Sequence, residues 1–157
     1  MTTLENLITI DAPEERVWAI LTNLAELGDY DPTVAASTVT SQIATGVGSA
    51  RKVTMRDGKH WFKERVSVFG PGDALTFELT ACNFPIKQLA HTYSFSEKNG
   101  TTVVKQVMTY TPKFGLLGRL LDTAVIRRNS DLGIKAFLAG LKAHAERSDR
   151  SHPTGDS

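Results

Sequence analysis

The sequence predicts an α+β fold in which a curved seven-stranded antiparallel sheet wraps around a long C-terminal helix, with one or two short helices after the first strand. In the middle of the chain, apolar and polar residues alternate with period two, which is typical of half-buried strands. This region contains Asp57-Gly58 and Asn99-Gly100, and such dipeptides are strong hairpin signals. Helical spacing returns from about Leu116 to Glu146. A helix of that length extends ~45 Å, enough to cover the apolar face of the sheet.

The first elements are predicted to be a strand and a helix. The apolar run at residues 4–10 predicts the strand, and Asp11-Ala12-Pro13 ends it. Proline suits the first turn of a helix, and the two glutamates that follow lie near the positive end of its dipole. Apolar residues then recur at helical spacing through about Leu24. The segment Gly28-Asp29-Tyr30-Asp31-Pro32 breaks this pattern.

The remaining strands follow one another through short turns, which implies an antiparallel meander. Their predicted ranges are 36–43, 49–56, 60–69, 73–80, 86–96 and 101–111. Pro112 ends the last of them, and the long helix follows, with Gly133 as the expected point of a bend. We predict one domain over residues 1–146, because ~100–200 residues suit a single core. The polar residues 147–157 are predicted to be a disordered tail.

Composition excludes several classes of function. Hydrophobic residues make up 41% of the 157 residues, which favours a packed core over disorder. The 18 Lys and Arg against 17 Asp and Glu leave no basic excess of the kind a nucleic-acid-binding protein shows. The single cysteine, Cys82, and the scattered histidines predict neither a disulfide nor a metal site. Because the sequence has neither an apolar run long enough to span a membrane nor a signal peptide, we expect a cytoplasmic protein with no membrane insertion. We expect it to be a monomer or a homodimer.

Alternation also predicts which side chains face inward. On the strand at 60–69, Phe62, Glu64, Val66 and Val68 share the apolar face, where an unpaired carboxylate is costly. The same pattern turns Arg51 inward on the preceding strand. A mostly apolar wall with a few polar groups is typical of a small-molecule pocket. The candidate catalytic residues are Glu64, His91 and Arg51, and the candidate ligand contacts are Val53, Met55, Phe62, Val66, Phe77, Tyr93, Gln106, Met108, Tyr110 and Leu121.

Each polar candidate also has a purely structural interpretation. Arg51 and Glu64 can form a buried ion pair that sets the strand register. His91 on an apolar face is more often a hydrogen-bonded interior histidine than a base. Arg127 and Arg128 are either part of a solvated helix face, or one of them lies at the cavity mouth and pairs with an acidic ligand group.

Five segments carry a resemblance to a known superfamily. They are Ile10-Asp11-Ala12-Pro13-Glu14-Glu15-Arg16-Val17-Trp18, Asp29-Tyr30-Asp31-Pro32, Gly46-Val47-Gly48-Ser49-Ala50-Arg51, Lys63-Glu64-Arg65-Val66 and Phe114-Gly115-Leu116-Leu117. Over about residues 3–146, the chain resembles the START/birch-pollen-allergen superfamily (SRPBCC). Within it, the chain is most similar to bacterial polyketide cyclase/dehydrase-like and lipid-transport-like proteins. The resemblance implies the helix-grip fold, with a deep apolar cavity between sheet and helix. It also implies a mouth formed by hairpin loops and the start of the last helix, and no built-in metal or organic cofactor.

Three functions remain open on the sequence alone. The first is a binding protein or carrier for a hydrophobic small molecule such as a lipid, polyketide or isoprenoid. The second is a cofactor-independent polyketide cyclase, aromatase or dehydratase. There, Glu64 or His91 would abstract an α-proton, and Arg51, Tyr93 or Tyr110 would stabilise the enolate oxygen. The third is a protein-interaction module in which the cavity is vestigial.

Overall fold

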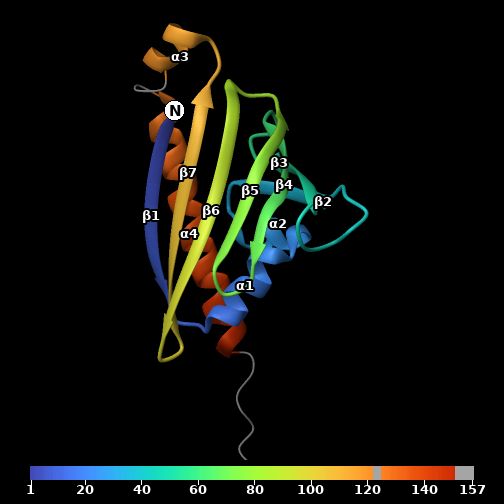
Figure 1. Ribbon diagram of the computed structural model, residues 1–157, viewed down its shortest axis with the longest axis vertical. Helices are drawn as coiled ribbons and strands as arrows, with labels where there is room; N and C mark the ends of the chain where they lie inside the picture. The colour runs from blue at the N-terminus through green and yellow to red at the C-terminus, as the bar shows by residue number, and fades with distance from the viewer. Residues whose placement is uncertain (122–124, 151–157) are drawn as a thin grey trace, which may run out of the picture.

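The seven strands form one antiparallel sheet, as predicted. The structure is a computed structural model that describes residues 1–121 and 125–150. The strand order is β1-β7-β6-β5-β4-β3-β2, and every neighbouring pair is antiparallel (Figure 1). The strands are β1 (Thr2–Ile10), β2 (Val34–Val39), β3 (Ala50–Met55), β4 (Trp61–Gly70), β5 (Ala74–Cys82), β6 (Ile86–Lys98) and β7 (Thr101–Pro112).

The second strand begins and ends earlier than predicted. Its observed range is Val34–Val39 rather than 36–43. After Thr40, the serine hydroxyl of Ser41 donates to the carbonyl of Ile43 and accepts from the amide of Ala50. This local side-chain bonding replaces the ladder hydrogen bonds, which ends the strand.

A bulge in β4 reverses part of the predicted face assignment. The pairing of β4 with β5 shifts between Val66 and Val68, so one extra residue interrupts the alternation. The prediction that Val68 faces inward is therefore wrong, and this residue is 46% exposed. Phe69 packs against the core in its place.

The helices after β1 pack against β2 and α4. They are α1 (Glu14–Thr22), a 3-10 turn at Leu24–Glu26 and α2 (Leu27–Tyr30). The buried residues of α1 are Val17, Ile20 and Leu21, which recur at helical spacing in the sequence. They belong to the core cluster that also contains Tyr30. The prediction of one or two short helices at this point is confirmed.

The long C-terminal helix is two helices rather than one. They are α3 (Gly115–Leu121) and α4 (Arg127–Arg150), and Gly133, the expected point of a bend, lies inside α4. The two helices differ in their surroundings, because Leu116, Leu117 and Leu120 of α3 are exposed. By contrast, α4 buries Ile134, Leu138 and Leu141. The helical spacing of apolar residues continues from one helix into the next, so this spacing does not show where the first helix ends and the second begins. α4 also continues past the predicted end at Glu146, and the rest of the predicted tail, residues 151–157, lies outside the described residues.

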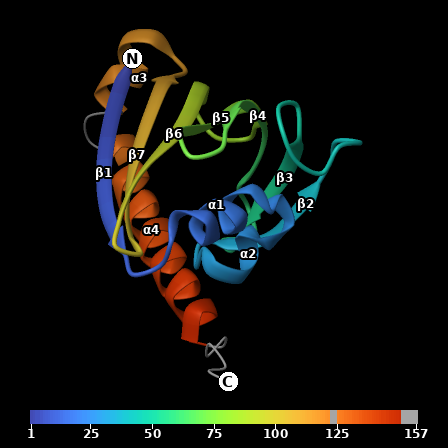
Figure 2. The same cartoon turned by 60° about the horizontal axis from the view of Figure 1, so that its bottom comes forward.

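α4 packs along the inside of the sheet, beside β1, and its later turns contact α1 and α2 (Figures 1 and 2). The ammonium group of Lys142 donates to the carbonyl of Thr9 over 2.9 Å, and Glu146 accepts from the amide of Asp11 over 3.0 Å. These contacts hold the C-terminal half of α4 against the end of β1. Within the described part of the chain, no helix has both the length and the apolar character needed to cross a membrane.

Candidate functional site

A cavity of about 560 Å³ lies between the sheet and the first half of α4. Its walls come from β3, β4, β6 and β7, from α4, and from Leu27, Asp31 and Thr33 in or just after α2. They are mostly apolar. The volume is in the range of small-molecule sites. The exposed residues of its lining mark the mouth, and they are Asp57, His60, Pro85, Val125 and Asn129.

Arg51 and Glu64 form an ion pair in the cavity wall. They are register partners on β3 and β4. The guanidinium Nε and Nη2 lie 2.8 and 2.6 Å from Oε1 of Glu64. Only 6% of Arg51 and 3% of Glu64 is exposed, and the guanidinium carbon also lies 4.6 Å from the ring centre of Phe77. Each buried charge therefore has a specific partner, which is the condition for tolerating it inside a protein.

His91 and Gln106 form a second polar pair, from β6 and β7. The amide nitrogen of Gln106 lies 2.7 Å from Nδ1 of His91. Burial lowers the pKa of His91 below its ordinary value; Glu64 raises it and Arg51 lowers it further. The imidazole is therefore neutral at pH 7. With the amide nitrogen donating, Nδ1 accepts and the single ring proton is on Nε2.

The same pair leaves one buried acceptor without a partner. Oε1 of Gln106 has no hydrogen-bond partner among the described residues, although the residue is only 1% exposed and lines the cavity. A buried polar atom of this kind normally bonds to a protein group, a water or a ligand.

Two further polar side chains line the wall. Tyr93 is buried, and its pKa is raised well above the ordinary value, mainly by burial and further by Glu64. Its hydroxyl therefore stays protonated and can donate a hydrogen bond. Asp31 accepts from the amide and the hydroxyl of Thr33 over 2.9 and 2.7 Å. Burial raises the pKa of Asp31, and the bonds from Thr33 oppose that increase.

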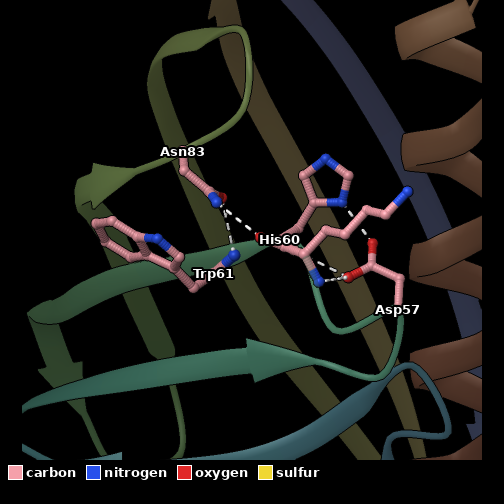
Figure 3. A network of polar contacts seen from close by, with 5 residues as sticks. Asp57, His60, Trp61 and Asn83 are labelled. Carbon is pink, nitrogen blue, oxygen red and sulfur yellow. Dashed lines mark hydrogen bonds and ion pairs between the residues drawn. The ribbon is translucent and has the colours of Figure 1, made fainter.

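A polar network connects two loops near the mouth (Figure 3). One carboxylate oxygen of Asp57 accepts from the backbone amides of Lys59 and His60, and the other contacts the His60 ring. His60 in turn lowers the pKa of Asp57. Asn83, before β6, accepts from the amide of Trp61 over 2.9 Å and donates to the carbonyl of Lys59 over 2.7 Å. The network holds the β3–β4 turn against the β5–β6 loop.

The structure brings many of the predicted site residues together. All three candidate catalytic residues, Arg51, Glu64 and His91, line the cavity. So do five of the predicted ligand contacts: Met55, Phe62, Tyr93, Gln106 and Met108. The sheet face predicted from alternation therefore contains the cavity wall.

Four predicted ligand contacts lie outside the lining of the cavity. Val53, Val66 and Phe77 belong to the core cluster that contains the residues of α1, and Tyr110 packs with Ile134 and Leu138. None of the four lines the cavity. Alternation identifies the inward face of a strand but not whether a helix or a cavity lies over each position. The tenth predicted contact, Leu121, has a side chain outside the described residues.

The sequence predicted that the last helix borders the cavity, but the predicted ligand contacts included no residue of α4. Asn129, Ser130, Gly133 and Phe137 line the cavity and are spaced by one, three and four residues. The helical periodicity of this segment contained that signal. Asp57 also lines the cavity, but it lies on a turn, where no periodic pattern predicts which side chains face a cavity. Arg127 and Arg128 are exposed and do not line the cavity, although their neighbours Ile126 and Asn129 do.

The lowered pKa of His91 predicts a pH dependence of stability. The unfolded chain takes up a proton on this histidine near pH 6.5, the ordinary value, whereas the folded chain does so only at a lower pH. The free energy of unfolding should therefore be highest above about pH 6.5 and should decrease as the pH falls below it. Urea denaturation between about pH 7.5 and 5 measures this. The decrease should be smaller in His91→Gln, and equal slopes in the two proteins would contradict the assignment.

Comparison with known proteins agrees with this architecture. A family model described as polyketide cyclase / dehydrase and lipid transport matches residues 1–146. None of the curated proteins matches the sequence. A protein from Thermus thermophilus is 19% identical with a TM-score of 0.79, over 94% of this chain and 99% of that one.

Two further solved structures have the same fold. The Zhui aromatase/cyclase from Streptomyces sp. R1128 is 14% identical with a TM-score of 0.78, over 99% of each chain. A START superfamily protein from Mycobacterium smegmatis is 10% identical with a TM-score of 0.75, over 92% of this chain and 97% of that one. At these identities, the similarity shows the helix-grip fold. Because the family model covers nearly the whole chain, the protein belongs to the polyketide cyclase/dehydrase and lipid transport family.

Proposed function

We propose that the protein binds a hydrophobic small molecule of the polyketide, lipid or isoprenoid type in the cavity between the sheet and α4. One observation carries this proposal: an apolar cavity of about 560 Å³ has in its wall a buried acceptor, Oε1 of Gln106, that no described residue satisfies. Apolar walls supply affinity through burial, and a few polar groups orient the ligand.

The polar side chains favour a ligand with a hydroxyl group. Gln106 offers an acceptor, while neutral His91 has its proton on Nε2 and Tyr93 keeps its hydroxyl proton. A hydroxyl both donates and accepts, so it can satisfy Gln106 and one of the two donors. The charges of Arg51 and Glu64 already neutralise each other, which leaves little demand for a charged ligand.

Binding of two matched aromatic probes tests the proposal. We expect 2-naphthol to bind about 3–10-fold more tightly than 2-methylnaphthalene, since one added hydrogen bond is worth roughly 0.5–1.5 kcal/mol. Gln106→Leu should remove most of this preference and retain binding of 2-methylnaphthalene, as measured by fluorescence titration. Gln88→Leu, on an exposed position of β6, is the matched control and should leave both affinities unchanged. Absence of saturable binding of either probe would overturn the proposal.

A cyclase or dehydratase is the second candidate, and the cluster of donors supports it. In such a reaction a base takes an α-proton, and the enolate carbon forms a bond to a ketone carbon of the same chain. The resulting alkoxide takes up a proton and can leave as water in a later elimination. The Nε2–H of His91 and the hydroxyl of Tyr93 are suited to stabilising the enolate oxygen, and Glu64 is the nearby carboxylate that can act as base.

Ligand affinity and turnover separate the two candidates. The measurements are binding of 2-naphthol and cyclisation of a linear poly-β-ketone, in the unmodified protein and in His91→Ala. Turnover that is lost in His91→Ala while the affinity persists would support the cyclase. Loss of affinity, with no cyclisation by the unmodified protein, would support a binding protein.

A further inference from the structure

Large apolar side chains gather on the surface between β7 and α4. Phe114 is 67% exposed, and Leu116, Leu117 and Leu120 of α3 are exposed to a similar degree. The group comprises Phe114, Leu116, Leu117, Leu120 and Val125, and we call it the α3 patch. Single exposed apolar residues are ordinary on protein surfaces, but several large ones between residues 114 and 125 are typical of an interaction site.

The α3 patch adjoins the mouth of the cavity. Val125 belongs to the patch and also lines the cavity, and Ile126 beside it lines the cavity too. Figure 1 shows α3 beyond the end of β7, next to the start of α4. An apolar ligand that leaves the cavity at this end therefore meets an apolar surface.

Basic residues accompany the patch. Lys113, Arg119, Arg127 and Arg128 lie between positions 113 and 128, where the sequence has one acidic residue, Asp122. All four basic residues are exposed. This local excess contrasts with the net charge of +1 for the whole chain. Exposed leucines and phenylalanine flanked by lysine and arginine form the combination that binds the interface of an anionic bilayer.

We propose that the α3 patch docks the protein on the surface of an anionic lipid bilayer, with the cavity mouth beside the membrane. The apolar side chains enter the interface, and the four cations contact anionic headgroups. A second copy of the chain fits less well, because a symmetric contact would bring two basic patches against each other. Docking of this kind needs no membrane-spanning helix. Passage of a ligand between bilayer and cavity rests on the proposed binding function, whereas docking itself does not.

Vesicle flotation of the full chain tests the docking. The protein should float with vesicles of about 70% phosphatidylcholine and 30% phosphatidylglycerol. It should bind pure phosphatidylcholine at least about tenfold more weakly, since each basic residue near an anionic surface contributes about fivefold in affinity. Leu116→Ser/Leu120→Ser should reduce binding about tenfold or more, because the buried apolar area supplies much of the affinity. Leu7→Ser, at a 69% exposed position of β1, is the control and should bind as the unmodified protein does.

A charge variant and two companion measurements separate the outcomes. Arg127→Gln/Arg128→Gln should reduce binding to the anionic vesicles without changing binding to phosphatidylcholine. If the protein floats with neither kind of vesicle, the docking proposal is overturned. It is also overturned if sedimentation velocity shows a dimer that Leu116→Ser/Leu120→Ser converts to a monomer, because the patch would then be a dimer interface. Titration with 2-naphthol in vesicle-free buffer reports the binding function separately. Normal 2-naphthol binding without flotation therefore overturns the docking alone.

Discussion

Replacing Arg51 with methionine is expected to lower the free energy of unfolding by about 3–5 kcal/mol. The substitution leaves the carboxylate of Glu64 buried, at 3% exposure, without the guanidinium that lies 2.6 Å from it. Removing one partner of a buried ion pair costs this much because the remaining charge is desolvated and uncompensated. Urea denaturation at pH 7 measures the change.

Two controls show whether the cost comes from the unpaired charge. The double variant Arg51→Met/Glu64→Leu should recover most of the lost stability, because two apolar side chains of similar volume replace the pair. Arg65→Met removes an exposed arginine that lies 3.5 Å from Glu78. It should cost less than about 1 kcal/mol. If the double variant is as unstable as Arg51→Met, the loss comes from packing rather than from charge.

The same variants separate the two interpretations of this pair. If Arg51 and Glu64 serve only to fix the register of β3 on β4, the double variant should keep the affinity for 2-naphthol. If either group contacts the ligand or the reacting atoms, affinity or turnover should fall although stability recovers. The geometry supports a structural contribution in either case, because the pair joins register partners on adjacent strands.

Replacing Gly140 with alanine is expected to lower the free energy of unfolding by about 3 kcal/mol. A Cβ at this position of α4 would lie 1.9 Å from the backbone carbonyl oxygen of Tyr30 and 3.3 Å from the ring of Pro32. Neither backbone nor proline ring can turn aside, so α4 would have to move away from α2. Overpacking of this kind costs roughly 1–3 kcal/mol, and more where the neighbour is rigid.

Gly133 provides the matched control on the same helix. An added Cβ there meets nothing within 4 Å, so Gly133→Ala should stabilise the protein by about 0.5–1 kcal/mol through helix propensity. Urea denaturation of both variants makes the comparison. A Gly140→Ala protein as stable as Gly133→Ala would contradict the close contact of α4 with Tyr30.

The sequence alone determined the order of the elements and the direction of most strand faces. Period-two alternation depends only on backbone geometry, so it placed Arg51, Glu64 and His91 on the inward face before any tertiary contact was known. It failed at Val68, where a bulge adds a residue to one strand of a pair. Bulges depend on how two strands meet, and a single strand's pattern does not contain that information.

Only the tertiary structure decided which inward positions face the cavity. Phe77 and Tyr93 both point inward from adjacent strands and belong to one core cluster, yet only Tyr93 also lines the cavity. The difference depends on where α1 and α4 cover the sheet, and that depends on contacts between segments far apart in the chain, such as Gly140 against Tyr30. Whether a partner faces the buried acceptor of Gln106, and whether a described segment covers the α3 patch, likewise depends on the tertiary structure.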